Sequence, residues 1–580
     1  MIRISELSLP VDHSAEALRG AILRRLGIED ADLLEFSVFK RSYDARRRSG
    51  ILFVYSIDLR ARDEASILRR LALDRHVGLA PDTGYHPVAR APAGLEERPL
   101  VVGFGPCGLF AALLLAQMGF RPIVLERGRD VRRRTQDTWA LWRKHRLDPE
   151  SNVQFGEGGA GLFSDGKLYS QIKDPRFLGR KVMAEFVRAG APAEILYINK
   201  PHIGTFRLTG VVAALREDII ALGGEVRFET RVAALEIAAG RIEGVRLADG
   251  SLLRSRHVVL APGHSARDLF RALHAQGVFM EPKAFSIGFR IEHPQSQIDR
   301  ARLGAFAGHA AIGAADYKLV HHAGNGRDVY SFCMCPGGTV VAATSEPGRV
   351  VTNGMSQYSR NERNANAGIV VGITPARDFP GGPLAGVELQ ERLESRAFEL
   401  GGGDYCAPAQ RVGDFLRGAV FGIAEGARAG KTLQLTGNVV RHPREGGAGH
   451  YRLVGGEIDQ IVLRVDAVVL GGGQRSVGIE DQRGAAGRES QHQLVCRRHA
   501  GGRAVKFEGQ RVADLDADAR VTRGVWLVDG RQFDTHQLLA QARRAVAAFG
   551  IHRLEAAGRK PGQNGHGQQP DGDAGPSRPH

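Results

Sequence analysis

The sequence predicts an α/β protein in which a central domain, built on a parallel sheet, follows a smaller α+β domain. Two observations predict this class: residues 99–125 show the pattern strand, glycine turn, helix and strand, and residues 1–90 alternate short strands with helices. The chain has 580 residues, of which 43% are hydrophobic and 25% charged, close to the averages of globular proteins. Its length suits three or four domains and excludes a small disulfide-held scaffold.

Residues 1–90 are predicted to form a ferredoxin-like α+β domain. The patterns indicate three strands and two helices, at residues 2–9, 14–26, 34–41, 50–59 and 64–74. Asp12 and Ser14 are suitable N-cap residues for the first helix, because their side-chain oxygens can accept from free backbone N–H groups. A segment rich in Pro, Ala and Gly at residues 80–98 then predicts a linker.

Residues 99–108, Pro-Leu-Val-Val-Gly-Phe-Gly-Pro-Cys-Gly, combine an apolar strand with a G-x-G-x-x-G turn. A helix and a second apolar strand follow, which is the βαβ context that this motif needs. Gly103 permits the tight turn, Gly105 lets the backbone approach a pyrophosphate, and Gly108 lets the helix pack on the strand. Glu126 follows the second strand, where a carboxylate can accept from an adenosine ribose. The pattern predicts a dinucleotide site.

The region after Glu126 favours FAD over NAD. Residues 224–250 are predicted to form a β-meander, and a strand at residues 257–260 leads into Ala261-Pro-Gly263. An Ala-x-Gly turn after an apolar strand is typical of two-dinucleotide flavoproteins, whereas an NAD dehydrogenase usually continues through further βα units. We therefore predict a Rossmann-like FAD-binding domain over residues 91–280, with an inserted β-meander.

A second glycine-rich loop at residues 155–168 has backbone N–H groups suited to an anionic ligand. In one interpretation, Lys167 or the nearby amides stabilise negative charge on the reduced flavin or the pyrophosphate. In the other, the loop is a surface hairpin and Lys167 points into solvent. The predicted cofactor-binding residues are Gly103, Gly105, Pro106, Cys107, Gly108, Glu126, Arg127, Gly159, Gly161, Ser164, Gly166, Lys167, Val232, Ala261 and Gly263.

Further segments, in order along the chain, carry a resemblance to a known family. They are residues 101–108 with Glu126, 158–168, 200–205, 260–268, 286–294, 332–338, 351–356 and 364–368. Over about residues 1–415 the sequence resembles the uncharacterised bacterial FAD-dependent dehydrogenases, which are distantly related to flavoproteins of the glutathione-reductase type. The resemblance implies a glutathione-reductase-type fold, a noncovalent FAD and a redox role, but it names no substrate.

Residues 281–415 are predicted to form a substrate-side α+β domain, with strands near 284–292, 329–334 and 338–345 building one sheet over the flavin face. Cys333 and Cys335 could act as a redox pair, but their spacing on one strand face favours packing as small apolar side chains. His202 and His264 are candidate proton donors because imidazole titrates near neutral pH, although the sequence shows a partner for neither.

Composition limits the partners and the location. Five cysteines are too few for a disulfide framework, and no apolar stretch reaches the length of a membrane span, so we expect a cytoplasmic protein without a membrane partner. The net charge of +15 is spread along the chain without a nucleic-acid-binding motif, which disfavours nucleic acid. No metal-ligand spacing is present, so no metal is expected. The oligomeric state is not indicated.

The resemblance stops after about residue 415. Residues 416–580 are rich in Arg, Gly and Gln and end in a polar tail at residues 558–580, for which we expect disorder. We hypothesise that this region is a shifted-frame translation or a fusion, and its divergence predicts weaker FAD binding.

These observations predict an FAD-dependent oxidoreductase that accepts a hydride from NAD(P)H or an organic donor, with an unknown small-molecule substrate. The alternative is a noncatalytic dinucleotide-binding or RNA-associated protein, in which the N-terminal domain and the basic surface would bind nucleic acid.

Overall fold

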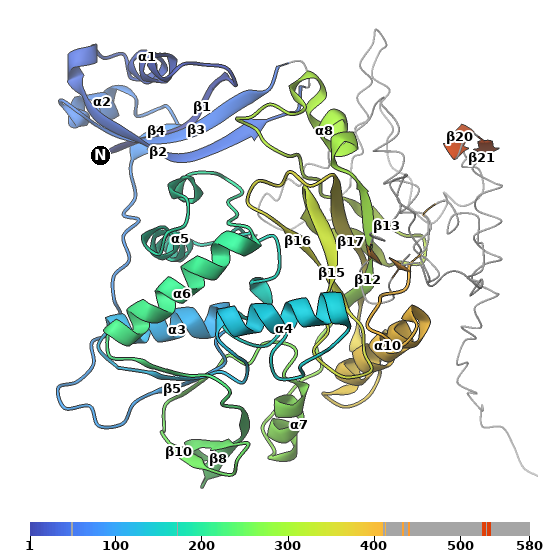
Figure 1. Cartoon of the computed structure of the whole chain (residues 1–580). Helices are drawn as coiled ribbons and strands as arrows, with labels where there is room; N and C mark the ends of the chain where they lie inside the picture. Colours follow the sequence, from blue (N-terminus) through green and yellow to red (C-terminus); the bar gives the residue numbers. More distant parts are fainter. Residues whose placement is uncertain are drawn as a thin grey trace, which may run out of the picture.

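A computed structural model describes residues 1–47, 50–170, 172–409 and 412, together with the backbone of four short strands (Figure 1). These strands are β18 (Thr432–Leu433), β19 (Val439–Val440), β20 (Val525–Val528) and β21 (Arg531–Asp534). Apart from them, the region predicted at residues 416–580, including the tail at 558–580, lies outside the described residues. Among the described helices, none is both long and apolar enough to cross a membrane.

The N-terminal unit is an antiparallel sheet of order β2-β3-β1-β4. Its elements are β1 (Ile2–Pro10), α1 (Ala15–Leu26), η1 (Asp30–Asp32), β2 (Leu33–Asp44), β3 (Leu52–Ala61), α2 (Glu64–Arg70) and β4 (Val77–Leu79). Ser14 caps α1, because its side chain accepts from the N–H of Ala17. The sequence patterns identified every element except η1 and β4, each of which has only three residues.

The central unit is a parallel sheet of order β11-β5-β6-β7. The strands are β5 (Leu100–Val102), β6 (Ile123–Leu125), β7 (Glu225–Arg227) and β11 (Val258–Leu260). Successive side chains point to opposite faces, so Val101 and Val124 belong to one hydrophobic cluster, whereas Leu100 and Val102 belong to another. The sheet is therefore covered on both faces.

Helices cover one face of this sheet and mostly strands cover the other (Figure 1). The helical layer contains α3 (Pro106–Gln117), α4 (Val131–Lys144), α5 (Leu178–Arg188) and α6 (Thr205–Ala221), with the short helices η2 (Gly159–Gly161) and η3 (Ala193–Leu196). The opposite layer contains an antiparallel meander, β8 (Val232–Ala238), β9 (Arg241–Leu247) and β10 (Leu252–Arg254), followed by α7 (Arg267–Ala275).

The predicted meander at residues 224–250 was partly wrong. Its first strand, β7, pairs in parallel with β6 and extends the central sheet, so only β8, β9 and β10 form the meander. The physical reason is the preceding helix α6, which crosses over the sheet and returns the chain parallel to β6. βα units thus continue after Glu126, contrary to the reasoning that favoured FAD over NAD.

The third unit contains two sheets, not the single sheet that we predicted. One sheet has the order β12-β17-β14-β13, and the other pairs β15 with β16. Their strands are β12 (Phe285–Pro294), β13 (Val320–His322), β14 (Asp328–Cys335), β15 (Gly338–Ala342), β16 (Thr352–Ser356) and β17 (Asn364–Ile373), and the helices are α8 (Gln295–Leu303), η4 (Gly304–Phe306), α9 (Pro375–Asp378) and α10 (Ala385–Gly401). A turn at Pro336–Gly337 separates β14 from β15 and lets the chain leave the first sheet.

One hydrophobic core joins the N-terminal unit to this third unit. The cluster contains Ile4 and Leu59 from the first sheet together with Phe289 and Ile369 from β12 and β17. The overall architecture is a mixed α/β fold.

Candidate functional site

A cavity of about 410 Å³ lies where β5, β6 and β11 end. The residues that follow these three strands line it, together with the start of α3, the glycine-rich loop around η2 and the beginning of β8. In open α/β sheets, ligands bind in the crevice outside the carboxyl ends of the parallel strands. The cavity is in this position.

The G-x-G-x-x-G turn at residues 103–108, called the fingerprint turn below, is closely packed at two of its three glycines. Gly103 has a φ of +95°, and a Cβ atom there would overlap the main-chain oxygen of Ala261. A Cβ atom at Gly108 would overlap the main-chain oxygen of Gly103, so this glycine lets α3 approach β5. Gly105 differs, because a Cβ atom there would meet only Gly159, at an ordinary 3.6 Å.

The N-terminus of α3 opens into the cavity. Gly105 is the N-cap residue and offers no side-chain cap, and both Pro106 and Cys107 line the cavity. The first N–H groups of a helix have no partner within the helix, and the helix dipole places partial positive charge there. This end of α3 is therefore suited to an anionic group such as a phosphate.

Glu126 is buried at the end of β6 and lines the cavity. Its carboxylate accepts hydrogen bonds from the backbone N–H groups of Phe104 at 2.7 Å, Gly128 at 2.9 Å and Gly156 at 2.9 Å. A carboxylate has about four acceptor positions, so one remains for a ligand hydroxyl. Glu126 thus holds the fingerprint turn and the glycine-rich loop together, a role that the sequence pattern did not indicate.

Arg134 of α4 is a structural residue that the sequence analysis missed. Its guanidinium is fully buried and lies against the glycine-rich loop. Burial lowers its pKa to about 10, although Glu126 and Glu157 oppose this shift. It donates to the main-chain oxygens of Asn152 (2.8 Å), Val153 (2.8 Å), Gly156 (3.3 Å), Glu157 (2.6 Å) and Gly159 (2.8 Å).

A signal for Arg134 was present in the helical periodicity of α4. The buried positions of this helix are Val131, Arg134, Thr138 and Leu141, which follow the spacing of one helix face. We assigned no role to Arg134 from the sequence. An arginine on the apolar face of a predicted helix indicates a buried guanidinium with backbone acceptors.

Most of the predicted cofactor-binding residues line the cavity, and four do not. The lining includes Gly103, Gly105, Pro106, Cys107, Glu126, Arg127, Gly159, Gly161, Val232, Ala261 and Gly263. Gly108, Ser164, Gly166 and Lys167 lie outside it. Arg127 also forms ion pairs with Glu150 at 2.9 Å and Asp268 at 3.0 Å, so other side chains already hold its guanidinium.

The two candidate histidines occupy different environments. His264 lines the cavity, and burial, followed by the charge of Arg267, lowers its pKa. His202 does not line the cavity; it stacks on Tyr358, and its Nε2 atom lies 2.8 Å from the main-chain oxygen of Tyr358. The structure therefore supplies the partner that the sequence did not show. Burial lowers the pKa of His202 to about 4, so its ring is neutral at pH 7.

Lys167 lies in a second cluster, outside the residues that line the cavity and not in the solvent position of the alternative interpretation. Its Nζ atom is 3.0 Å from Asp165 Oδ2, 3.7 Å from Cys335 Sγ and 4.0 Å from Cys333 Sγ. Asp165 also forms an ion pair with Arg360. The Lys167 side chain is only 19% exposed, so these contacts are poorly screened by water.

The two cysteines, which we predicted to pack as small apolar side chains, lie at an irregular point of β14 beside charged side chains. The register of β14 against β17 shifts between Phe332 and Cys335, and Cys333 has a φ of +45°. The two sulfur atoms lie 4.0 Å apart, beside Lys167 and Arg290. The hydrogen bond from Cys335, then the two cations, hold the pKa of Cys333 well below its usual range, while the same pairing and burial raise that of Cys335.

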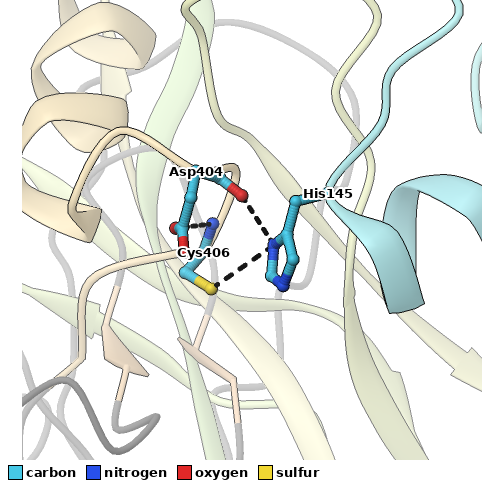
Figure 2. A group of neighbouring side chains, drawn as sticks. All are labelled: His145, Asp404 and Cys406. Carbon is cyan, nitrogen blue, oxygen red and sulfur yellow. Dashed lines mark hydrogen bonds between the residues drawn. The ribbon is translucent and has the colours of Figure 1, made fainter.

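A third group joins the end of α4 to the segment after α10. His145, Asp404 and Cys406 bring potential metal-ligand atoms within 4.8 Å of one another (Figure 2). His145 Nδ1 already lies 2.7 Å from the main-chain oxygen of Asp404 and 3.8 Å from Cys406 Sγ. Burial, and then Asp404, raise the pKa of Cys406 to about 12, so this thiol stays protonated at neutral pH.

Three family matches cover much of the chain. Residues 200–305 match the family described as FAD dependent oxidoreductase, and residues 284–430 match "FAD-dependent protein, C-terminal domain-like". Residues 1–60 match a domain of unknown function. The second match extends beyond residue 415, where we expected the resemblance to end.

A relative from Clostridium beijerinckii, named only as an uncharacterized protein, is 45% identical over 421 residues, which are 72% of this chain and 78% of the relative. Among solved structures, the amino acid oxidase NikD is 18% identical with a TM-score of 0.23, over 49% of this chain and 72% of NikD. The halogenase PltM is 12% identical with a TM-score of 0.27, over 53% and 57%. At these TM-scores the two structures add nothing to the argument.

The family matches agree with the cavity at the strand ends. The chain belongs to the FAD-dependent oxidoreductases, and its cofactor is FAD.

Proposed function

We propose that this oxidoreductase binds FAD in the cavity at the ends of β5, β6 and β11 and oxidises either NAD(P)H or an organic donor by hydride transfer. The observation that carries the proposal is the uncapped N-terminus of α3, which opens into that cavity beside the buried carboxylate of Glu126. The family matches give no support to the noncatalytic, RNA-associated alternative.

The residues present fit the adenosine diphosphate part of FAD. The N–H groups at Cys107 and the next residue, together with the positive end of α3, would hold the pyrophosphate. The remaining acceptor position of Glu126 would take a ribose hydroxyl, and residues 261–263 and Val232 would close the other side. When bound, FAD supplies the hydride-accepting group that no amino-acid side chain provides.

His264 is the residue that we propose as a proton carrier. It lines the cavity next to Gly263, and its lowered pKa keeps the imidazole neutral at pH 7, so it can accept a proton there. Lys167, Cys333, Cys335 and His202 lie outside the residues that line this cavity, so we assign none of them to the FAD site.

The proposal also covers the fold type of the first two units, the cellular location and the class of substrate. The order β4-β1-β3-β2, with α1 and α2 as the crossovers, supports a ferredoxin-like N-terminal unit. The parallel sheet with its inserted meander supports the glutathione-reductase type. We further propose a cytoplasmic protein with a small-molecule substrate, since its positive charge follows no nucleic-acid-binding pattern.

The test is an absorption titration of the full-length protein with FAD, followed by NADPH under anaerobic conditions. Retained flavin bands that bleach with NADPH are expected. Gly105→Val should lower FAD affinity at least about tenfold, because the valine side chain would project where the backbone must approach the pyrophosphate. Gly210→Val is the matched control, since Gly210 has open space around it on α6 and does not line the cavity.

One outcome would contradict the proposed cofactor site, and another would narrow the choice of donor. Equal FAD affinity for wild type and Gly105→Val would move the cofactor away from the fingerprint turn. Flavin that binds normally but is reduced by no nicotinamide cofactor would remove NAD(P)H as the donor and leave the organic donor to be sought.

A further inference from the structure

The cluster around Lys167 contains the cations Lys167, Arg290 and Arg360 and the carboxylate of Asp165. It carries more positive than negative charge and is mostly buried. Arg290 is 3% exposed, and its guanidinium contacts the Asn366 amide oxygen at 2.6 Å, the main-chain oxygen of Cys333 and Cys335 Sγ at 3.3 Å. Among the described residues, these contacts include no carboxylate. Buried cations are ordinarily paired, because an unpaired buried charge is costly.

One carboxylate serves the other two cations of the cluster. Asp165 pairs with both Lys167 and Arg360, which leaves Arg290 without a neutralising carboxylate among its contacts. The two thiols lie next to Lys167 and Arg290 and can become anionic. Lys167 Nζ lies 4.0 Å from Cys333 Sγ, and Arg290 contacts the main-chain oxygen of the same residue, so these cations would stabilise a thiolate on Cys333.

The backbone of β14 brings the two thiols together. At the bulge, the backbone of Cys333 adopts a left-handed conformation, which residues other than glycine and asparagine rarely take. Its sulfur atom faces that of Cys335. Cys335 is fully buried, whereas Cys333 is partly exposed. A small reagent can therefore reach Cys333 first, and Cys335 lies within 4.0 Å to react second.

We propose that Cys333 and Cys335 form a dithiol site that reduces hydroperoxides, with Cys333 as the attacking thiolate, Cys335 as the resolving thiol, and Lys167 and Arg290 as the positioning cations. The limited exposure favours a small oxidant over a protein disulfide. The proposal does not depend on the proposed hydride transfer, since the reaction needs no flavin.

The reaction has two steps. The Cys333 thiolate attacks the terminal oxygen of ROOH, an S–O bond forms, the O–O bond breaks, and the alkoxide takes a proton to leave as ROH. The Cys335 sulfur then attacks the sulfenic sulfur, an S–S bond forms, and hydroxide leaves with the Cys335 proton as water. Two electrons pass from the thiols to the peroxide. An external dithiol such as dithiothreitol restores the two thiols.

The test uses the full-length chain with Cys107, Cys406 and Cys496 replaced by serine, so that only the pair remains. One equivalent of hydrogen peroxide should remove both thiols and two hydrogen atoms by intact mass spectrometry, and dithiothreitol should restore them. Cys335→Ser in this background should stop at a sulfenic acid on Cys333, trapped by dimedone. Cys333→Ser should leave Cys335 reduced.

A lysine series tests the role of the cation. Lys167→Met should slow the reaction about tenfold or more, because a cation within about 4–6 Å lowers a thiol pKa by roughly 1–3 units. Lys167→Arg should restore most of the rate, which a merely structural role would not predict. If the pair stays reduced under peroxide, or if Cys335 reacts equally well without Cys333, the proposal is wrong. An unchanged rate in a folded Lys167→Met variant would remove the lysine from it.

Discussion

At the scale of single residues, Arg134 shows how one side chain shapes the cofactor site. Arg134→Met should destabilise the protein by about 3–4 kcal/mol, because several buried carbonyl oxygens would lose their donor. FAD affinity should fall with it, since the glycine-rich loop lines the cavity. Urea unfolding and FAD titration measure the two effects.

Arg133→Met is the matched control for this prediction. The neighbouring Arg133 pairs with Asp130 and Glu229 on the surface, with 48% of its side chain exposed, so its loss should cost much less. Similar losses for the two variants would show that the loop does not depend on the buried guanidinium.

The buried histidines predict how stability changes with pH. Burial lowers the pKa of His202 and of His293 to about 4, so both rings stay neutral in the folded protein while the unfolded chain binds protons below about pH 6.5. The free energy of unfolding should therefore decrease from pH 7 to pH 5, by about 1.4 kcal/mol per pH unit for each ring below pH 6.5. Urea unfolding at both values measures it.

His293→Asn should flatten this dependence, whereas the exposed His86→Asn should leave it unchanged. A wild-type protein equally stable at pH 7 and pH 5 would mean that these rings already bind protons in the folded state.

At the scale of elements, the contact between α3 and β5 depends on Gly108. A Cβ atom at this position would overlap the main-chain oxygen of Gly103, so Gly108→Ala must push the helix away from the strand. We expect a loss of stability of about 2–4 kcal/mol and loss of FAD binding. Gly105→Ala is the control, since its Cβ has room and should leave stability nearly unchanged. Thermal unfolding compares them, and equal melting temperatures would contradict this account of the turn.

The sequence predicted elements better than their pairing. The residues around Gly103 and Glu126 identified β5, α3 and β6, because apolar runs and a glycine turn are local signals. The bulge in β14 was not predicted, since a strand of period two gives no sign of one extra residue, and the charged surroundings of the cysteines were not predicted either. The contacts of Lys167 were also not predicted, because its neighbours Cys333 and Cys335 are distant from it in sequence.

At the scale of the whole molecule, the N-terminal unit is part of the core of the third unit and not a detachable module. Removing residues 1–79 should uncover apolar side chains such as Phe289, Ile291 and Ile369, which share its hydrophobic cluster. We expect an insoluble or dye-binding product, measured by the soluble fraction and by binding of a hydrophobic fluorophore. A soluble, monodisperse truncation would show that the third unit covers this surface without the first.

The double anchoring of the glycine-rich loop by Glu126 and Arg134 has a kinetic consequence. Both anchors are groups of the protein itself, so the walls of the cavity hold their shape before any ligand arrives. A ligand entering such a preformed site loses little free energy in ordering the chain, and its association does not wait for a loop to fold. FAD should therefore bind in a single concentration-dependent phase, and weakening either anchor should introduce a slower rearrangement after the first encounter.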